Sequence, residues 1–540
     1  MKNKNIIIVI VDSARYYSTG GKDDRDKLDM MFDFEKESIY FSHAVSSAPS
    51  SVMSAGALFT GLDSYYISRN YDDFRYDNDV FLSLPNILEN NNYEIKSIYN
   101  SKELRDNFGD LTPEVSEKFW PDNINYNDKR WSNFDCNVVL DNFLSNRSNK
   151  EKPLFLMIWY NIRKDPTTSS EMEKNINILK KYGYFDDSIY LLAADHGYMD
   201  PKRGYTPEWL KENGLTHDLI MTDDNIRIPM YLKYPGSQAI QIDEQVGNID
   251  VLPTLLDLLN IEYKNNQNEE TYSMSLLPLI DRSSHAIEKF NKRKIRSDGR
   301  FFAQYNRSTT LRTNEYKYTI RPDLNKEEFH DLSADPFEEN NLINNDNLQS
   351  LINEFRLEYE NSEDQAIRFQ TKILLDKFIQ TFDVKKYGKS TKILLLGFAE
   401  KYYLENILNF FPDKIESDID LVVNEEFSSD SQISKYNHIF YYSNNRVKIN
   451  GRYDLVITLF DSRNREKYLQ IENYIFKQIK FSKKIYLDSN MEIKKELSTK
   501  SFKDMYNILI LSRRKYIRDP KIFLNHIKIG FSILTKKIFR

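Results

Sequence analysis

Three separate segments carry side chains that could do chemistry together. Asp12 ends an apolar run in VIVDSAR, and Asp195-His196 follows a second apolar run, IYLLAA. If both runs are strands of a parallel sheet, their carboxyl ends lie at the same edge, where ligands gather. Two carboxylates and an imidazole suit a divalent cation, and the hydroxyl of Ser51, at the start of a possible helix, could complete the set. Asp12, Asp195 and His196 are therefore candidate ligands of one divalent cation, with Ser51 as a possible fourth.

Each of these residues also has a purely structural interpretation. Asp is favoured at the first positions of helices, so Asp12 and Asp195 could be helix caps, and Ser51 could be one as well. His196 could be a buried histidine with satisfied hydrogen bonds. The metal hypothesis depends on their meeting at one place, which needs a particular arrangement of strands.

The segments between these residues predict that arrangement. Short apolar runs at 6–11, 93–99, 154–160 and 189–194 read as strands, and they are separated by polar or helical stretches. This is the pattern of a parallel sheet covered on both faces. Helical spacing occurs at 81–90 and 249–260, and a late strand is predicted at 316–320. The fold class is therefore α/β.

A second α/β pattern begins after a charged, helical connector at 361–390. Strands are predicted at 393–397, 419–423, 438–442, 453–460 and 484–487. No G-x-G-x-x-G fingerprint follows the first of them, so a Rossmann-like domain is expected without a recognisable dinucleotide site. The predicted organisation is a domain at 1–360, the connector, a Rossmann-like domain at 391–512 and a basic amphipathic tail at 513–540.

Composition excludes several classes of protein. The 540 residues include 75 Lys and Arg and 81 Asp and Glu, which gives a net charge of −6. This charge argues against a protein that binds nucleic acid through an overall positive electrostatic field. An aromatic content of 14% excludes disorder as a description of the whole chain. The single cysteine, Cys136, excludes an intrachain disulfide and a cysteine zinc cluster.

The ends of the chain bear on its location. The apolar run near the N-terminus is too short for a signal peptide, and no run is long enough for a membrane span, so a cytoplasmic protein is expected. The tail at 513–540 interleaves basic and apolar residues. It could lie as a helix on the inner, anionic membrane surface, or it could dock on its own domain with a solvated basic face.

In their order, these segments resemble the sulfatase branch of the alkaline phosphatase superfamily. In that branch the nucleophile lies ten residues before the Gly of an L-x-T-G segment, here Gly61 in LFTG, which places Ser51 at the nucleophile position. The family's S/T-D-H-G segment is similar to ADHG at 194–197, and its His ahead of R-V-P is similar to His217 ahead of RIP at 227–229. Four later segments also agree in order: NIDVLPTLLDLLNI, SMSLLPLI, LRTNEYKYTI and FHDLSADPFEENNL. The resemblance spans residues 4 to 346.

This resemblance implies a fold and a set of roles. It implies a mixed sheet sandwiched by helices and one divalent metal ion (Mn, Mg, Ca or Zn) at Asp12, Ser51, Asp195 and His196. Ser51 and His217 would be catalytic, and His217 and Arg15 would contact an anionic phospho- or sulfo-ester. The structural alternatives are a surface histidine for His217 and an ordinary ion pair for Arg15.

The sequence also departs from the sulfatase pattern. A sulfatase nucleophile is a formylglycine made within C/S-x-P/A-x-R, but SVMSA at 51–55 lacks both the Pro/Ala and the Arg. The upstream run SAPSS, which begins at Ser47, fits only the first part of that motif, and the family's lysine segment G-K-W is absent. Asp165-Pro166 matches the second metal segment of two-metal relatives but brings no His, which favours a single metal.

An unmodified Ser at this position resembles the phospho-transferring relatives, which are phosphatases, phosphodiesterases, and phosphoglycerol or phosphoethanolamine transferases. The sequence therefore predicts a metal-dependent hydrolase or phosphotransferase that acts on a phospho-ester through Ser51, in surface-glycan or lipid-precursor metabolism. Two alternatives stay open: a sulfuric ester hydrolase, and a non-catalytic binding protein that retains the fold.

Overall fold

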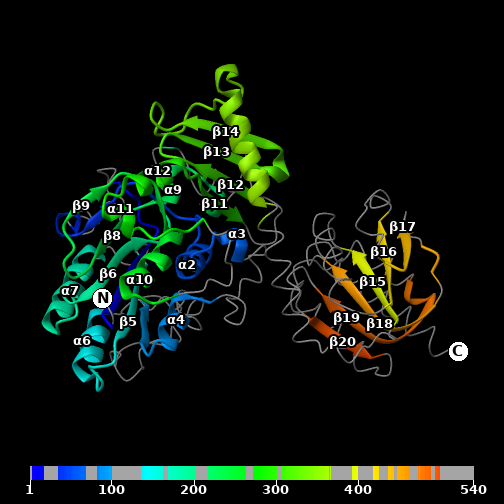
Figure 1. Ribbon diagram of the computed structural model, residues 1–540, viewed down its shortest axis with the longest axis horizontal. Helices are drawn as coiled ribbons and strands as arrows, with labels where there is room; N and C mark the ends of the chain where they lie inside the picture. Colours follow the sequence, from blue (N-terminus) through cyan, green and yellow to red (C-terminus); the bar gives the residue numbers. More distant parts are fainter. Residues whose placement is uncertain are drawn as a thin grey trace. The chain divides into compact units, whose positions relative to one another are not determined.

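The computed structural model divides into two compact units, Met1–Ala366 and Ile367–Arg540 (Figure 1). Each unit has its own sheets and its own hydrophobic core. The structure describes residues 3–17, 34–67, 82–99, 136–161, 168–200, 203, 217–262, 272–300, 307–363, 365, 392–398, 418–424, 436–442, 447–449, 451–460, 472, 475–487 and 493–498.

The first unit is built around a mixed sheet. Its seven strands have the spatial order β4-β5-β1-β6-β8-β2-β9. The first four pair in parallel, β8 is antiparallel to both β6 and β2, and β9 is parallel to β2. The strands are β4 (Glu94–Tyr99), β5 (Leu154–Asn161), β1 (Asn5–Asp12), β6 (Ser188–Ala194), β8 (Met230–Lys233), β2 (Ile39–Phe41) and β9 (Ile240–Ile242). The predicted α/β fold with a mixed sheet is confirmed.

Helices cover both faces of this sheet. α6 (Cys136–Asn146) and α7 (Thr168–Lys181) pack together on one side, and α2 (Ser51–Thr60), α4 (Leu84–Asn90) and α10 (Val251–Leu259) lie on the other (Figure 1). The remaining short helices are η2 (Phe34–Glu37), α3 (Ser64–Ile67), η7 (His217–Leu219), α9 (Asp223–Ile226), η8 (Asn248–Asp250), α11 (Leu277–Ile280), α12 (Ser284–Lys292), η9 (Pro322–Leu324) and η10 (Asp346–Leu348).

Two smaller sheets complete the first unit. A three-stranded sheet joins β10 (Val246–Gly247), β3 (Ala44–Val45) and β7 (Arg227–Ile228). A four-stranded antiparallel sheet runs in chain order through β11 (Ile295–Arg300), β12 (Arg307–Arg312), β13 (Tyr316–Arg321) and β14 (Lys326–Asp331). The helical residues 349–363 pack Ile352 and Phe355 into the core of this sheet.

A buried ion cluster joins the four-stranded sheet to the loop segment that holds α9. Arg312 of β12 donates to the Asp223 carboxylate at 2.7 and 3.0 Å, and Lys317 of β13 lies 3.1 Å from it. Lys317 also pairs with Glu338. Burial by itself raises the pKa of Asp223, but the Arg312 and Lys317 cations hold that pKa well below its ordinary value. The carboxylate is therefore ionised and fixed, and it anchors the sheet.

The second unit has the predicted Rossmann-like arrangement. Its six strands have the spatial order β17-β16-β15-β18-β19-β20, and all neighbouring strands pair in parallel except β19 and β20. Counted from β15, this is the order 3-2-1-4-5-6 of a doubly wound sheet. The strands are β15 (Lys392–Phe398), β16 (Asp418–Asn424), β17 (His438–Tyr442), β18 (Gly451–Phe460), β19 (Ile479–Leu487) and β20 (Ile493–Ser498).

The predicted basic tail at 513–540 and most of the connector at 361–390 lie outside the described residues. Among the residues that are described, no helix combines the length and the apolar character that a membrane crossing needs.

Candidate active site and metal centre

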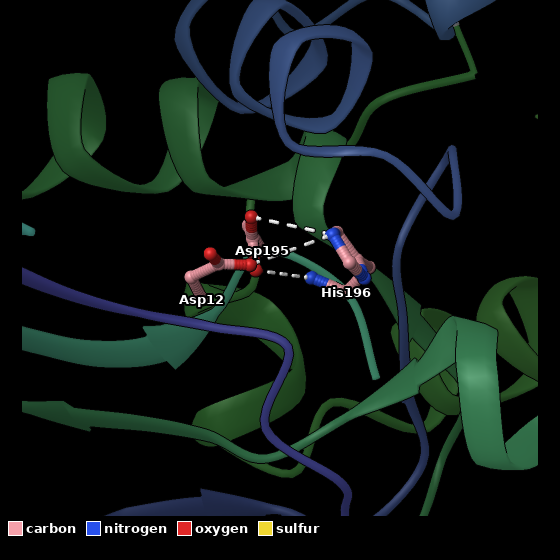
Figure 2. Close-up of side chains that lie close together, drawn as sticks. All are labelled: Asp12, Asp195 and His196. Carbon is pink, nitrogen blue, oxygen red and sulfur yellow. Dashed lines mark hydrogen bonds and ion pairs between the residues drawn. The ribbon is translucent and has the colours of Figure 1, made fainter. Parts of the chain in front are cut away.

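Asp12, Asp195 and His196 converge at one edge of the large sheet. Their side chains point toward one another, and one ligand atom from each lies within 4.8 Å of the others (Figure 2). His196 Nε2 is 3.7 Å from Asp12 Oδ1 and 3.6 Å from Asp195 Oδ2. All three residues are buried. The sequence-predicted carboxylates and imidazole therefore form a compact group that could hold a metal ion.

The parallel pairing of β1 and β6 brings these residues together. Val11 pairs with Ala194, so Asp12, the last residue of β1, and Asp195, the first residue after β6, lie at the same edge of the sheet. Gly197 then lets the chain pass against the segment that contains α9. A Cβ atom at residue 197 would lie 2.2 Å from the backbone oxygen of Asp224, and the Gly197 amide donates to the oxygen of Asn225 at 2.8 Å. The glycine of the D-H-G segment is thus required by close backbone packing.

Hydrogen bonding sets the orientation of the His196 ring. Its Nδ1 lies 2.7 Å from the backbone oxygen of Gly197, which can only accept, so Nδ1 carries a proton. In the neutral ring, Nε2 then carries the lone pair and faces Asp12 and Asp195. Metal-binding histidines in proteins are commonly oriented by such a bond from the second ring nitrogen.

The charge balance of the group favours a cation. The Oδ2 atom of Asp195 is buried and lacks a hydrogen bond of normal geometry among the described residues. Burial raises the pKa of Asp195, and the neighbouring Asp12 carboxylate adds to the effect, while His196 and the nearby Ser51 hydroxyl oppose it. Two close carboxylates and an imidazole lone pair repel one another unless a positive charge lies between them. The residues present therefore fit a divalent cation.

Ser51 begins α2 beside this group. Its Oγ lies 3.4 Å from His196 Nε2, and the residue is half-buried. The preceding Ser50 is the N-cap of α2, but its side chain makes no capping hydrogen bond. The first amide groups of a helix carry partial positive charge and attract anions, so the start of α2 is suited to a negatively charged group next to Ser51.

A buried polar network, which the sequence did not reveal, ties α2 to the end of β6. Ser54 Oγ donates to the backbone oxygen of Asp195 at 2.5 Å, and Asn248 Nδ2 donates to Ser54 Oγ at 3.0 Å. The Oδ1 atom of Asn248 accepts from the amide of Ser47 at 3.0 Å. Asn248 begins the segment NIDVLPTLLDLLNI and Ser54 lies in SVMSA, but neither segment indicates by itself that the two side chains meet.

Of the remaining predicted site residues, Arg15 is described by the structure, whereas the side chain of His217 is not. Arg15 is fully buried, and its Nη1 lies 4.0 Å from Asp200 Oδ1. His217 is the first residue of η7, and its side chain lies outside the described part of the chain. Asp165-Pro166 and the segment from residue 100 to residue 135 also lie outside it.

Comparison with protein families gives two matches. The family model described as Sulfatase matches residues 4–162, and the model described as N-sulphoglucosamine sulphohydrolase, C-terminal, matches residues 211–365. Together the two stretches cover more than half of the chain and include Asp12, Ser51 and His217.

Curated relatives with two kinds of activity match over shorter stretches. A choline-sulfatase of Rhizobium meliloti is 28% identical over 170 residues, which are 32% of this chain and 30% of that protein. A lipoteichoic acid synthase of Staphylococcus saprophyticus is 32% identical over 94 residues, which are 17% of this chain and 14% of that protein. The chain spans about a third or less of the length of these curated relatives.

Solved structures share the fold of the first unit. The structure of a 2-O GAG sulfatase superposes with a TM-score of 0.52 and 16% sequence identity. The superposition covers 68% of this chain and 93% of that one.

Proposed function

Because the chain belongs to the sulfatase branch of the alkaline phosphatase superfamily, we propose that it is a metal-dependent hydrolase or transferase that acts on a phospho-ester through Ser51. One observation carries this proposal. The Ser51 hydroxyl stands at the start of α2, 3.4 Å from His196 Nε2 and beside the two carboxylates of Asp12 and Asp195.

The proposed reaction has two steps. A divalent cation held by Asp12, Asp195 and His196 would make the Ser51 hydroxyl more acidic and offset charge on the phosphoryl oxygens. Ser51 Oγ gives up its proton and forms a bond to phosphorus while the bond from phosphorus to the leaving oxygen breaks, and that oxygen takes up a proton. Water or an acceptor hydroxyl then attacks phosphorus and loses its own proton, the bond from phosphorus to Ser51 Oγ breaks, and Oγ takes up a proton. The first product is an alcohol, and the second is phosphate or a new ester.

The residues around Ser51 favour phosphate over sulfate chemistry. Formylglycine formation in the family uses C/S-x-P/A-x-R, and Met53 and Ala55 stand here in place of the Pro/Ala and the Arg. An unmodified hydroxyl is thus the proposed nucleophile. The similarity to a protein named as a lipoteichoic acid synthase supports a transfer reaction in surface-glycan or lipid-precursor metabolism.

The second candidate function is a sulfuric ester hydrolase. The similarity to a choline-sulfatase and the match to the Sulfatase family support it. The two candidates differ in the state of Ser51. Oxidation to formylglycine removes a pair of hydrogens from its peptide, whereas trapping of a phospho-enzyme adds the elements of HPO₃.

Arg15 and His217 remain proposed contacts for the anionic substrate, and His217 is also the proposed proton donor to the leaving oxygen. A cytoplasmic location with contact to the inner membrane surface through the basic tail remains a further proposal. Vesicle sedimentation with anionic and neutral lipids tests the membrane contact.

The decisive experiment for the function is a substrate screen. Purified protein is assayed with aryl phosphate monoesters, diesters and sulfates in the presence of Mn²⁺, Mg²⁺, Ca²⁺ or Zn²⁺. We expect turnover of a phospho-ester with at least one of these ions and a loss of at least about a hundredfold in Ser51→Ala, because the covalent route is closed. Mass spectrometry of the Ser51 peptide is expected to show serine, and phosphoserine after trapping.

Ser47→Ala is the matched control, because the buried Ser47 hydroxyl has no hydrogen-bond partner among the described residues. Its activity should equal that of the unaltered protein. Full activity of Ser51→Ala would remove Ser51 from the mechanism, and formylglycine at position 51 would favour the sulfatase. Failure to bind any divalent ion or to turn over any ester would favour the non-catalytic alternative.

A further inference from the structure

Ser13 has an unusual backbone conformation next to the metal group. Its φ angle is 62°, in the left-handed region that non-glycine residues rarely adopt. The residue is fully buried, directly after Asp12. Strained backbone of this kind persists only where the surrounding structure holds it, and it is concentrated at functional sites.

This conformation directs two donors of Ser13 at two different carboxylates. The Ser13 amide donates to Asp195 Oδ1 at 3.0 Å, and the Ser13 hydroxyl donates to Asp12 Oδ1 at 2.7 Å. The amide of His196 donates to the same Asp195 oxygen at 2.8 Å. With Oδ1 of Asp195 occupied by two amides, the other oxygen, Oδ2, faces His196 Nε2.

We propose that Ser13 is a positioning residue, which uses its left-handed backbone to hold Asp12 and Asp195 in the orientation that binds the cation. The inference rests on the proposed function, because it requires the metal site. Ser13 itself is assigned no contact with the metal or the substrate. Its hydroxyl fixes the Asp12 carboxylate, and its amide leaves Asp195 Oδ2 as the oxygen available to a ligand.

Two variants separate the hydroxyl from the backbone. Ser13→Gly removes the hydroxyl and relieves the strain, since glycine adopts positive φ without cost, whereas Ser13→Ala removes the hydroxyl and keeps the strain. Asn260→Ala is the matched control, because Asn260 is exposed, has a φ of 53° and caps the far end of α10.

Full-length protein stripped by a chelator is titrated with Mn²⁺ in a calorimeter, and melting temperatures are recorded without metal.

We expect Ser13→Gly and Ser13→Ala to bind Mn²⁺ about 10 to 100 times more weakly than the unaltered protein, the range for loss of a group that orients a metal ligand. Ser13→Ala should also melt at a lower temperature than Ser13→Gly. Asn260→Ala should melt at a lower temperature with Mn²⁺ affinity unchanged.

Unaltered Mn²⁺ affinity in Ser13→Gly would overturn the role of the Ser13 hydroxyl, and unaltered affinity in the strained Ser13→Ala as well would overturn the positioning role as a whole, while the metal site would stand in both cases. Equal loss of affinity in Asn260→Ala would also overturn it, because affinity would then follow general stability. If the unaltered protein binds Mn²⁺ no better than Asp195→Asn does, the proposed function is refuted, and the inference is refuted with it.

Discussion

At the scale of one residue, burial changes the protonation of the Asp63 carboxyl in the first unit. Burial raises the pKa of Asp63 to about 7; Arg296 and Arg293 oppose this rise, and Asp298 and Asp250 add to it. Its Oδ1 atom has no hydrogen-bond partner among the described residues. The folded protein therefore holds a proton on Asp63 at pH values where an unfolded chain has lost it.

This difference predicts a pH dependence of stability. The pKa of Asp63 is about 7 in the folded protein and 3.8 in its ordinary state. The bound proton therefore stabilises the fold fully below pH 3.8, and this contribution is lost as the pH rises through about 7. Asp63→Asn keeps a neutral side chain at every pH. We expect this variant to melt at a higher temperature than the unaltered protein at pH 8 and to show a flatter pH profile between pH 4 and 8.

Thermal unfolding from pH 4 to pH 8 measures this effect, with the exposed Asp257→Asn as control. The control should follow the profile of the unaltered protein. If the melting temperature of Asp63→Asn follows the same pH dependence as that of the unaltered protein, Asp63 is ionised in the folded state.

At the scale of elements, the attachment of the four-stranded sheet depends on buried charge. Arg312→Ala removes the guanidinium that donates two hydrogen bonds to the Asp223 carboxylate, and that carboxylate is buried away from water. Removal of one member of a buried pair costs about 3 to 5 kcal/mol, because the other charge stays desolvated. We expect a loss of that size in the free energy of unfolding measured in urea.

Arg356→Ala provides the comparison, since Arg356 and Glu327 form a partly exposed pair, with side chains 32% and 30% accessible. Exposed pairs contribute about 1 kcal/mol or less. Equal effects of the two substitutions would mean that the cluster around Asp223 does not anchor the sheet.

At the scale of the whole molecule, all the proposed metal-binding residues belong to one unit. Asp12, Ser51, Asp195 and His196 lie within Met1–Ala366, which has its own core. A compact unit with its own core can fold alone. We expect a protein of residues 1–366 to unfold cooperatively and to bind Mn²⁺ within about threefold of the full chain, as measured by calorimetry.

The full chain is the control in that experiment, and it should show an additional unfolding transition from the second unit. A shortened protein that is folded but has lost Mn²⁺ binding would show that the second unit contributes to the site.

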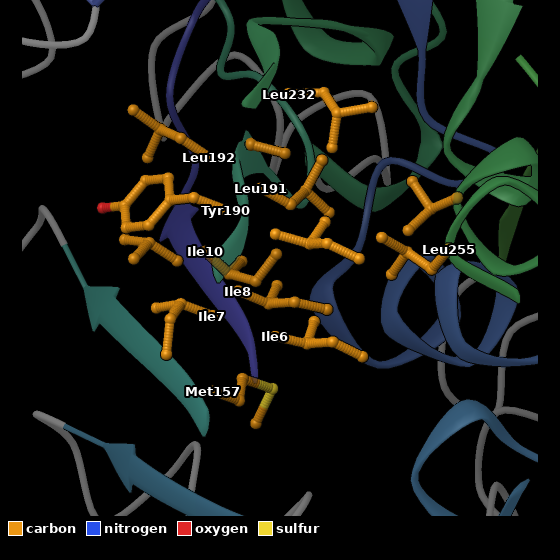
Figure 3. Packing of buried hydrophobic residues seen from close by; sticks show 14 of the residues in the cluster. Ile6, Ile7, Ile8, Ile10, Met157, Tyr190, Leu191, Leu192, Leu232 and Leu255 are labelled. Carbon is orange, nitrogen blue, oxygen red and sulfur yellow. The ribbon is translucent and has the colours of Figure 1, made fainter. Parts of the chain in front are cut away.

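The sequence by itself determined the central strands and the chemical character of the site. The run of β-branched and apolar residues at Ile6–Val11 is buried on both faces of β1, and Ile6, Ile7, Ile8 and Ile10 pack among the residues of neighbouring elements (Figure 3). Such a run is too short for a helix and too apolar for an exposed strand, so local composition was sufficient. Asp12 and Asp195-His196 were identifiable because each directly follows one of these runs.

Only the tertiary structure decided the geometry that a ligand would meet. The two- to four-residue strands β3, β7, β8 and β10 are too short to show periodicity, and they form because distant segments supply their hydrogen bonds. The left-handed turn at Ser13 and the Asn248–Ser54 network likewise arise from partners far away in the chain. Residue types are a local property, whereas distances between side chains depend on every packed element between them, and those contacts have no signature in any single segment.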